Sequence, residues 1–511
     1  MNNNSRLYNA ICNVGIGGVL QFLALILTFF SRTLFVEYLG IEYLSLDGLF
    51  ANILTILNFS ELGIGSAIIY SLYKPIAEGD KRKVIALMHL FRNAYRFIIL
   101  AIIILGVSVM PMLKYIVSDI PDVKEDLSFI YSLFLINTIL TYVWGYKKSF
   151  LVANQENYRV QLIYHCVHAI QITIQIAVLY FAHNYILYLL ILMIGTISNN
   201  IISTLYVNYK YPWLSSFINS KLDKAEKKGI FSNIKAIAMY KFGAVMLNGT
   251  NNIIISVCIK TTLVGLCSNY FLIINSINMV INQALSGLMA SIGNFSVKAT
   301  PSENRSIFQK LDFFTFWLIS YICIGLCAYT NALIEIWLGS SYIMEDYVLY
   351  ILIASFYIMI MNSIPSTFRS ALGLFEKAKY FPLLASIINI TTGSILSFYC
   401  GIIGVFIGNI VSRFTCFTLV DASIVFRKVF EDKLREYYLT YFLRILFCIA
   451  VISLCVVARN WGYVGEPKTI HSLIIHTITY TFLYNILFIF IFWKSAGMKY
   501  LFILIKKHCH L

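Results

Sequence analysis

The feature that most constrains this chain is a succession of apolar runs, most of them close to 20 residues long, separated by short polar loops. An α-helix of that length matches the hydrocarbon thickness of a bilayer. The composition agrees, because 59% of the 511 residues are hydrophobic and only 12% are charged, about half the charged fraction of a soluble domain. The runs predict fourteen membrane spans, over residues 12–36, 44–70, 97–113, 127–146, 160–182, 184–207, 236–258, 263–293, 313–338, 347–364, 380–400, 402–426, 439–458 and 470–493.

The loops test the number of spans independently. If the N-terminus is cytoplasmic, alternate loops should collect Lys and Arg. The predicted inner segments hold 30 of the 39 basic residues, and the predicted outer loops hold five. One missed span would invert every later loop, so this bias predicts that both termini are cytoplasmic. The net charge of +15 is then explained by topology, and nucleic acid is not an expected partner.

The first apolar run is expected to be a retained span. Only Arg6 precedes it, and it continues past Phe30 without the small-residue cleavage site of a signal peptide.

The spans suggest a division into two lobes. The basic stretch 211–235 predicts a cytoplasmic linker between a six-helix lobe at 1–210 and a second at 236–428, followed by two extra helices and a tail at 429–511. A shift of about 220 residues lays the first span on the seventh and the second on the eighth. This favours an internal repeat, which is common in transporters. The longest extramembrane segment, 208–235, leaves no room for a soluble catalytic domain.

Ionisable residues within the spans are the first functional candidates, because a charge in hydrocarbon is costly and normally faces a cavity or a partner. The basic candidates for substrate binding are Arg32, Lys241 and Arg413, and the acidic candidates for ion coupling are Asp47 and Glu61. The alternative is a structural role for these charges. Arg32 would form an ion pair with Asp47, and the side chains of Lys241 and Asp421 would reach the membrane interface. Arg32 and Arg413 lie too deep to extend easily, which favours a functional role for them.

Amide side chains form two further candidate surfaces. Lys241, Asn248 and Asn252 have the spacing i, i+7, i+11, which is one helix face. The next span carries a polar stripe of Ser268, Asn275, Asn278, Asn282 and Ser286. Hydrogen bonding between helices is the structural alternative, whereas the length of the stripe favours the wall of a hydrated cavity.

No pattern in the sequence predicts catalysis. We find no P-loop, HExxH, nucleophile elbow or Asp-rich diphosphate motif, so neither catalytic residues nor a cofactor are expected. The eleven cysteines form no CxxC pair and no spaced Cys/His set, so no metal site is expected. His165 and His168 share a helix face with Gln161 and Gln175. A metal or proton-relay role is one interpretation, and hydrogen-bonded polar groups within a bundle are the favoured one.

Two stretches resemble a known family. Glu61–Ala67 (ELGIGSA), after a long second span, resembles the corresponding part of bacterial polysaccharide flippases of the Wzx type, in the multidrug/oligosaccharidyl-lipid/polysaccharide exporter superfamily. Gly265–Asn294 is similar to the eighth helix of that family, and the similarity runs from about residue 8 to 430. The family has no sharp catalytic signature, so the resemblance identifies no catalytic residues.

The resemblance implies a fold, a location and a cargo. The fold would be two six-helix lobes around a central cavity, plus two extra helices, in the bacterial inner membrane. The function would be export of undecaprenyl-diphosphate-linked oligosaccharide to the outer leaflet, for O-antigen, lipopolysaccharide or capsule assembly. Membrane lipids and other polysaccharide-assembly proteins are then candidate partners. Without a nucleotide-binding motif, the energy would come from an ion gradient, the membrane potential or downstream use of the product.

Other functions stay open at this point. A peptidoglycan-precursor flippase is the nearest alternative. A multidrug cation exporter of the same superfamily would be expected to show acids deep in its cavity, so Arg32 and Arg413 count against it. From a different class, a polysaccharide polymerase usually has a large outer loop, which the chain lacks. A membrane acyltransferase would need a buried His or Asp at a membrane face, and the sequence identifies none.

Cysteine labelling tests the predicted topology. In a background without the native cysteines, cysteines placed near Asp122 and Glu345 should react with an impermeant maleimide in intact cells. Cysteines near Lys81, Lys227 and Lys433 should react only after permeabilisation. Labelling near Lys227 from outside would contradict both the topology and the two-lobe division.

Overall fold

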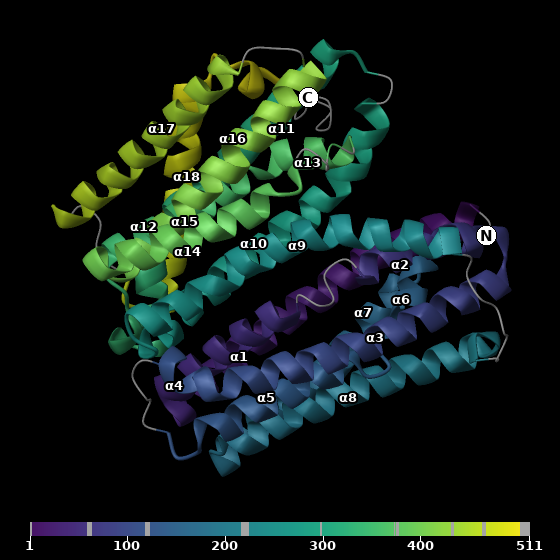
Figure 1. The fold of residues 1–511 in the computed structure, drawn as a ribbon. Helices are drawn as coiled ribbons and strands as arrows, with labels where there is room; N and C mark the ends of the chain where they lie inside the picture. Colours follow the sequence, from purple (N-terminus) through teal and green to yellow (C-terminus); the bar gives the residue numbers. More distant parts are fainter. Residues whose placement is uncertain are drawn as a thin grey trace. The chain divides into compact units, whose positions relative to one another are not determined.

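A computed structural model describes residues 3–58, 64–117, 123–215, 224–296, 299–372, 374, 378–430, 434–461 and 467–500. Within these ranges every regular element is a helix (Figure 1). Together with the apolar composition of the helices, this confirms the predicted fold class, an all-α polytopic membrane protein. The chain forms two compact units, Met1–Gly265 (unit 1) and Leu266–Leu511 (unit 2). Residues 224–235, predicted as linker, are the first turns of a helix, and the predicted division at 211–235 stays a prediction.

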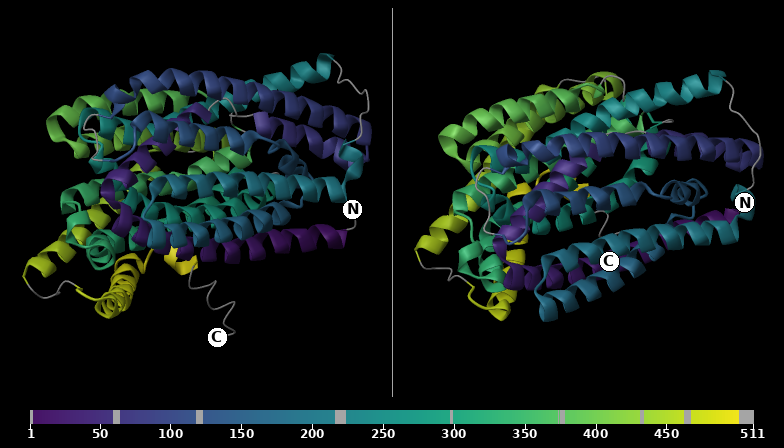
Figure 2. Two further views of the ribbon diagram at one scale, coloured as in Figure 1. Left: turned by 90° about the horizontal axis from the view of Figure 1, so that it is seen from below. Right: turned by 60° about the horizontal axis from the view of Figure 1, so that its bottom comes forward.

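Unit 1 is built from helices that lie side by side, and α7 contacts both α1 and α8 (Figure 2). Its first helix contains a non-helical residue, Gly40, with φ 84°, a conformation that glycine adopts readily because it lacks a Cβ. This kink at one residue lies between the spans predicted at 12–36 and 44–70. The helices are α1 (Asn3–Leu57), α2 (Ile64–Glu78), α3 (Lys81–Val109), α4 (Leu113–Ile116), α5 (Leu127–Tyr142), α6 (Tyr146–Ala153), α7 (Asn157–Ala182), α8 (Tyr185–Lys210) and α9 (Lys224–Cys258).

The span predicted at 127–146 is broken. Helices α5 and α6 meet at an angle of 44°, and Trp144 between them has a left-handed backbone, with φ 59°. The amide of Asn200 on α8 donates to the carbonyl oxygens of Leu140, Thr141 and Val143, at 2.7, 3.3 and 2.9 Å. Carbonyls exposed by a break inside a membrane protein need such a partner. One buried side chain therefore stabilises the break.

Unit 2 contains the remaining helices and two π-helical turns. The π turns Phe414–Thr418 and Phe426–Phe430 flank α16, so the span predicted at 402–426 is irregular within its length. The helices are α10 (Thr262–Ser296, which begins just before the unit boundary), α11 (Pro301–Leu338), α12 (Asp346–Met361), α13 (Ser363–Ala371), α14 (Phe381–Cys400), α15 (Ile402–Arg413), α16 (Leu419–Val425), α17 (Arg435–Asn460) and α18 (Ile470–Phe492).

The number of spans agrees broadly with the prediction. In the described ranges eleven helices are long and apolar enough to cross a membrane, or twelve if the bent pair α5–α6 is one span. One of the eleven, Gln21–Leu57, contains the Gly40 kink and covers two predicted spans. The 35 residues of α9 cover the span predicted at 236–258.

The two C-terminal helices are attached to α11 by polar contacts. On α18, the Tyr480 hydroxyl donates to the Tyr321 carbonyl at 2.5 Å, and Asn485 accepts a hydrogen bond from the Trp317 indole at 3.1 Å. On α17, Arg444 forms an ion pair with Asp312, and both side chains are buried. The Arg444 guanidinium also lies 4.9 Å from the centre of the Phe316 ring. Sequence reasoning missed this pair, although Arg444 lies within a predicted span.

The ion pair of Arg444 and Asp312 should stabilise unit 2 chiefly by compensating two buried charges. Removing one partner of a buried pair costs about 3–5 kcal/mol, whereas replacing both with apolar residues is often neutral. We therefore expect Arg444→Leu to lower the melting temperature in detergent and Asp312→Leu/Arg444→Leu to recover most of the loss. Equal destabilisation by the single and double variants would contradict this account.

Candidate functional site

The kink at Gly40 places Asp47 near Arg32. In one straight helix the two residues would be about 22 Å apart at 1.5 Å per residue, yet their charges interact. Tyr188 on α8 interacts with both charges and is hydrogen-bonded to Ser31. Arg32 and Asp47 are half-buried. The structure thus brings together a predicted binding cation and a predicted coupling acid, with a tyrosine beside them.

Aromatic side chains extend this cluster within unit 1. The Phe35 ring lies 5.9 Å from the ring of Tyr185 and 5.1 Å from that of Tyr188, both with edge-on geometry. Tyr185 is 1% exposed, and its hydroxyl has no hydrogen-bond partner. Tyr43, on the far side of the kink, donates to the Glu125 carboxylate at 2.6 Å. Arg32 and Asp47 therefore sit beside a wall of tyrosines.

The polar residues predicted on one face of α9 differ in exposure. Asn248 is exposed, and its amide donates to the Ala244 carbonyl of its own helix at 3.0 Å. Asn252 is 6% exposed, and its Oδ1 has no hydrogen-bond partner. Lys241 is half-buried. Next to Asn248, a Cβ added at Gly249 would lie 2.8 Å from the Ile56 side chain, so α9 packs closely on α1.

The asparagines predicted as a stripe share one face of α10. Asn275 and Asn282 are exposed, Asn278 is half-buried, and the Asn282 amide donates to Asn278 at 2.9 Å. Ser268 lies nearer the N-terminal end of the helix, and the Ser286 side chain is outside the described residues. Amides are costly in contact with lipid, so this face requires water or a polar partner.

Arg413 belongs to a network inside unit 2. Its Nε donates to Asn409 Oδ1 at 2.7 Å, and the Ser355 hydroxyl on α12 donates to the same oxygen at 2.7 Å. Arg413 is the last residue of α15, directly before the first π turn. These contacts fix its guanidinium against the body of the unit and support a structural role beside the predicted binding role.

The structure corrects the interpretation of Asp421. Instead of extending to the interface, Asp421 is 1% exposed and forms an ion pair with Arg369, equally buried, at 3.3 Å. The Asn362 amide donates to the same carboxylate at 2.9 Å. Arg369 falls between the spans predicted at 347–364 and 380–400, yet it lies in α13. Glu61, the second acidic candidate, lies outside the described residues.

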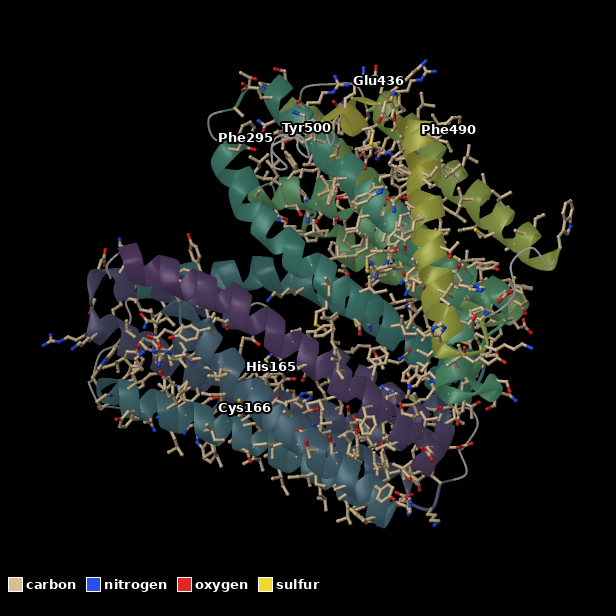
Figure 3. All side chains as sticks on the ribbon, turned by 180° about the vertical axis from the view of Figure 1, so that it is seen from behind. His165, Cys166, Phe295, Glu436, Phe490 and Tyr500 are labelled. Atoms are coloured by element: carbon tan, nitrogen blue, oxygen red, sulfur yellow. The ribbon has the colours of Figure 1, made fainter. Side chains whose placement is uncertain are left out.

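The histidines on α7 do not form a metal site. His165, marked in Figure 3, is 5% exposed, and neither ring nitrogen has a hydrogen-bond partner. The Tyr164 ring stacks on His168 at 5.4 Å. Among the described residues no group of three His, Cys, Asp or Glu side chains could hold a metal. The favoured interpretation, hydrogen-bonded polar groups, does not hold for His165.

Unit 2 also contains a cavity of about 630 Å³ between α11, α12, α17 and α18. Its wall is mostly apolar, with Glu335 and Asp346 among the polar lining residues. Asp346 accepts a hydrogen bond from Asn331 at 2.7 Å, and Asn331 accepts one from Tyr270 at 2.6 Å.

These features, long apolar helices with polar groups at their breaks, define a polytopic membrane protein, and its fold is that of transporters of the MOP superfamily. A multidrug resistance MATE family transporter of this superfamily, inward-facing, has a TM-score of 0.59 and 12% identity, covering 80% of this chain and 98% of that one. The lipid II flippase MurJ, inward closed, has a TM-score of 0.58 and 16% identity, covering 87% and 99%. A Vibrio cholerae MATE transporter, VcmN, has a TM-score of 0.54 and 12% identity, covering 84% and 100%.

No protein-family model matches the chain, and no curated protein is similar to it in sequence. At 12–16% identity, the structural similarity shows the fold. A shared fold does not identify a cargo.

The asparagine face of α10 should be accessible to water. In a background without the native cysteines, Asn282→Cys should react rapidly with a hydrophilic thiol reagent. Val280→Cys is the matched control, because Val280 is also exposed but lies on the opposite, apolar side of the helix. Equal rates at the two positions would show that the asparagine face has no special access to water.

Proposed function

We propose that this protein moves an anionic, lipid-linked oligosaccharide from the cytoplasmic to the outer leaflet of a bacterial inner membrane. The cargo would be an undecaprenyl-diphosphate-linked unit for surface polysaccharide, as the sequence resemblance implies. Both termini would be cytoplasmic. The fold supports a transporter, since MATE transporters and a lipid II flippase share it.

The observation that carries the proposal is the pairing of the buried charges. Asp47, Asp312 and Asp421 each have an arginine as a charge partner. A carrier of organic cations needs carboxylates that are available to its cargo, and these three are already compensated. A diphosphate instead needs accessible cations, and arginine suits it because the planar guanidinium binds two oxygens at once.

The candidate residues can be assigned distinct roles. Arg32 is the proposed diphosphate ligand, with Asp47 releasing it when the anion arrives or when a proton binds the carboxylate. Lys241, Asn248 and Asn252 on α9 would guide the headgroup. The asparagines of α10 suit sugar hydroxyls, because an amide both donates and accepts hydrogen bonds. Arg413 would act as a second cation, held in place by Asn409. Glu61 stays a candidate for ion coupling.

A peptidoglycan lipid-precursor flippase is the second candidate. The similarity to the lipid II flippase MurJ favours it, because the alignment covers 87% of this chain. The cargo of both candidate functions has a diphosphate on a polyprenyl chain, so Arg32 would bind the same group in each. The two cargoes differ in the glycan. The accumulating intermediate distinguishes them: deletion of the gene should enrich either an oligosaccharide-linked or a peptidoglycan-linked lipid.

A double variant separates anion binding by Arg32 from simple charge compensation. Arg32→Ala should abolish export in a complementation assay, with Arg32→Lys partly active because it keeps the charge but loses the bidentate fork. Arg32→Ala/Asp47→Ala removes both charges and should restore protein level and melting temperature without restoring export. The measurements are surface polysaccharide, accumulated lipid-linked intermediate and the amount of protein in the membrane.

The pair Asp312→Leu/Arg444→Leu is the matched control, because it removes a buried ion pair remote in sequence from Arg32. It should retain export. Wild-type export from the Arg32→Ala/Asp47→Ala variant would reduce Arg32 to a charge partner of Asp47 and would remove it from the transport path.

A further inference from the structure

A group of cations in unit 1 lies apart from the proposed transport residues. Arg92 and Arg96 are on α3 and Lys147 is on α6. The two helices meet through aromatic rings: Tyr95 lies 6.5 Å from Tyr146. The Arg92 charge interacts with Lys147 and with Tyr146, and the Arg96 charge also interacts with Tyr146. Arg92, Arg96, Lys147 and Tyr146 are called the α3–α6 cluster below.

Within the described ranges, no carboxylate forms an ion pair with Arg92, Arg96 or Lys147. Among the described residues, the Arg92 charge acts on His89, Lys147 and Tyr146, none of them acidic. Its Nε is buried and has no hydrogen-bond partner. Lys147 donates one hydrogen bond, to Asn208 at 2.6 Å, and an ammonium group has three donors. Neighbouring cations that repel one another while leaving donors unused favour an anion between them.

The buried acid nearest in sequence to Lys147 is committed elsewhere. Glu156, 5% exposed, accepts bonds from Lys210 at 2.7 and 2.8 Å and pairs with Arg159 at 3.1 Å. Tyr211 donates to the same carboxylate. Burial raises the pKa of the Tyr211 hydroxyl, and the hydrogen bond to Glu156 raises it further, so Tyr211 stays protonated as a donor. Glu156 therefore serves its own network.

The broken span fixes the position of the cluster. Lys147 follows the break directly, and the Asn200 amide holds the carbonyls on the other side of it. A Cβ at Gly145 would lie 2.7 Å from the Thr141 carbonyl, so the turn tolerates little change. Cations that only satisfy the positive-inside rule need no such rigid backbone, because an exposed loop suffices for them.

We propose that the α3–α6 cluster binds a phosphate group, from a lipid headgroup at the membrane surface or from a free phosphate. The two guanidinium groups supply planar, paired donors, and Lys147 supplies a point charge, the combination that recognises phosphate oxygens. Basic pockets between transmembrane helices on the cytoplasmic side bind anionic headgroups in this way. The site does not depend on the proposed transport function.

Binding to the purified full-length chain in neutral detergent tests the proposal. The probe is phosphatidic acid, a phosphomonoester lipid, with diacylglycerol as the lipid without phosphate, and bound lipid is counted by native mass spectrometry. Wild type should bind phosphatidic acid and not diacylglycerol. Arg92→Gln/Lys147→Gln should weaken binding by about a hundredfold, because each of the two lost charge-assisted bonds is worth roughly tenfold. Arg92→Lys should be intermediate, and it serves as the test if the double variant does not fold.

Arg82→Gln is the control, since Arg82 is an exposed cation on the same helix and its loss also lowers the net charge, by one unit against two in the double variant. It should bind phosphatidic acid like wild type. Pyrophosphate added as a competitor distinguishes the two sources of the phosphate group. If pyrophosphate displaces phosphatidic acid, the phosphate group alone suffices for binding. If phosphatidic acid stays bound to wild type but not to the variants, the site requires the lipid. Absence of binding by wild type, or an equal loss in Arg82→Gln, would overturn the site.

Discussion

Among the described residues, two buried ion pairs of arginine and aspartate and one further arginine–aspartate charge interaction lie within the helices of this protein. Arg32 interacts with Asp47 in unit 1, and Arg369 with Asp421 and Arg444 with Asp312 in unit 2. In hydrocarbon a lone charge costs several kcal/mol, and its partner cannot be water. Each pair joins segments separated in sequence by a kink or by other helices. The charges therefore constrain which helices pack together, as well as what the protein can bind.

The irregular parts of the backbone also need polar partners supplied by the protein. The chain breaks its helices at Gly40, at Trp144 and in two π turns, and polar side chains hold the backbone or a charged group at two of these breaks. Asn200 satisfies the carbonyls near Trp144, and Asn409 holds Arg413 at the start of a π turn. Breaks in membrane helices are tolerated only where protein groups or water replace the lost hydrogen bonds. Arg413 and Lys147, one from each proposed site, lie next to such breaks.

The proposed function depends on which charges are already compensated. A list of intramembrane charges from sequence contains both bases and acids, and it would fit either an anion or a cation as cargo. The ion-pair network removes Asp312 and Asp421 from that list, together with their partners Arg444 and Arg369. It leaves an arginine beside tyrosines in unit 1 and an exposed amide face on α10, groups that suit phosphate and sugar oxygens better than an organic cation.

The sequence by itself determined the class of protein and most of the spans, because the apolar length needed to cross a bilayer and the bias of Lys and Arg among loops are local properties. It also indicated the amide face of α10, since helix periodicity fixes which residues share a face. It left Arg369 between two predicted spans, offered the interface as one alternative for Asp421 and predicted a continuous span at 127–146, and the structure changed all three. Those features depend on partners distant in the chain, such as Asn200 for the broken span and Arg369 for Asp421. Only tertiary structure decided them, because the free energy of a buried polar group is set by the neighbour that satisfies it, and hydropathy contains no information about that neighbour.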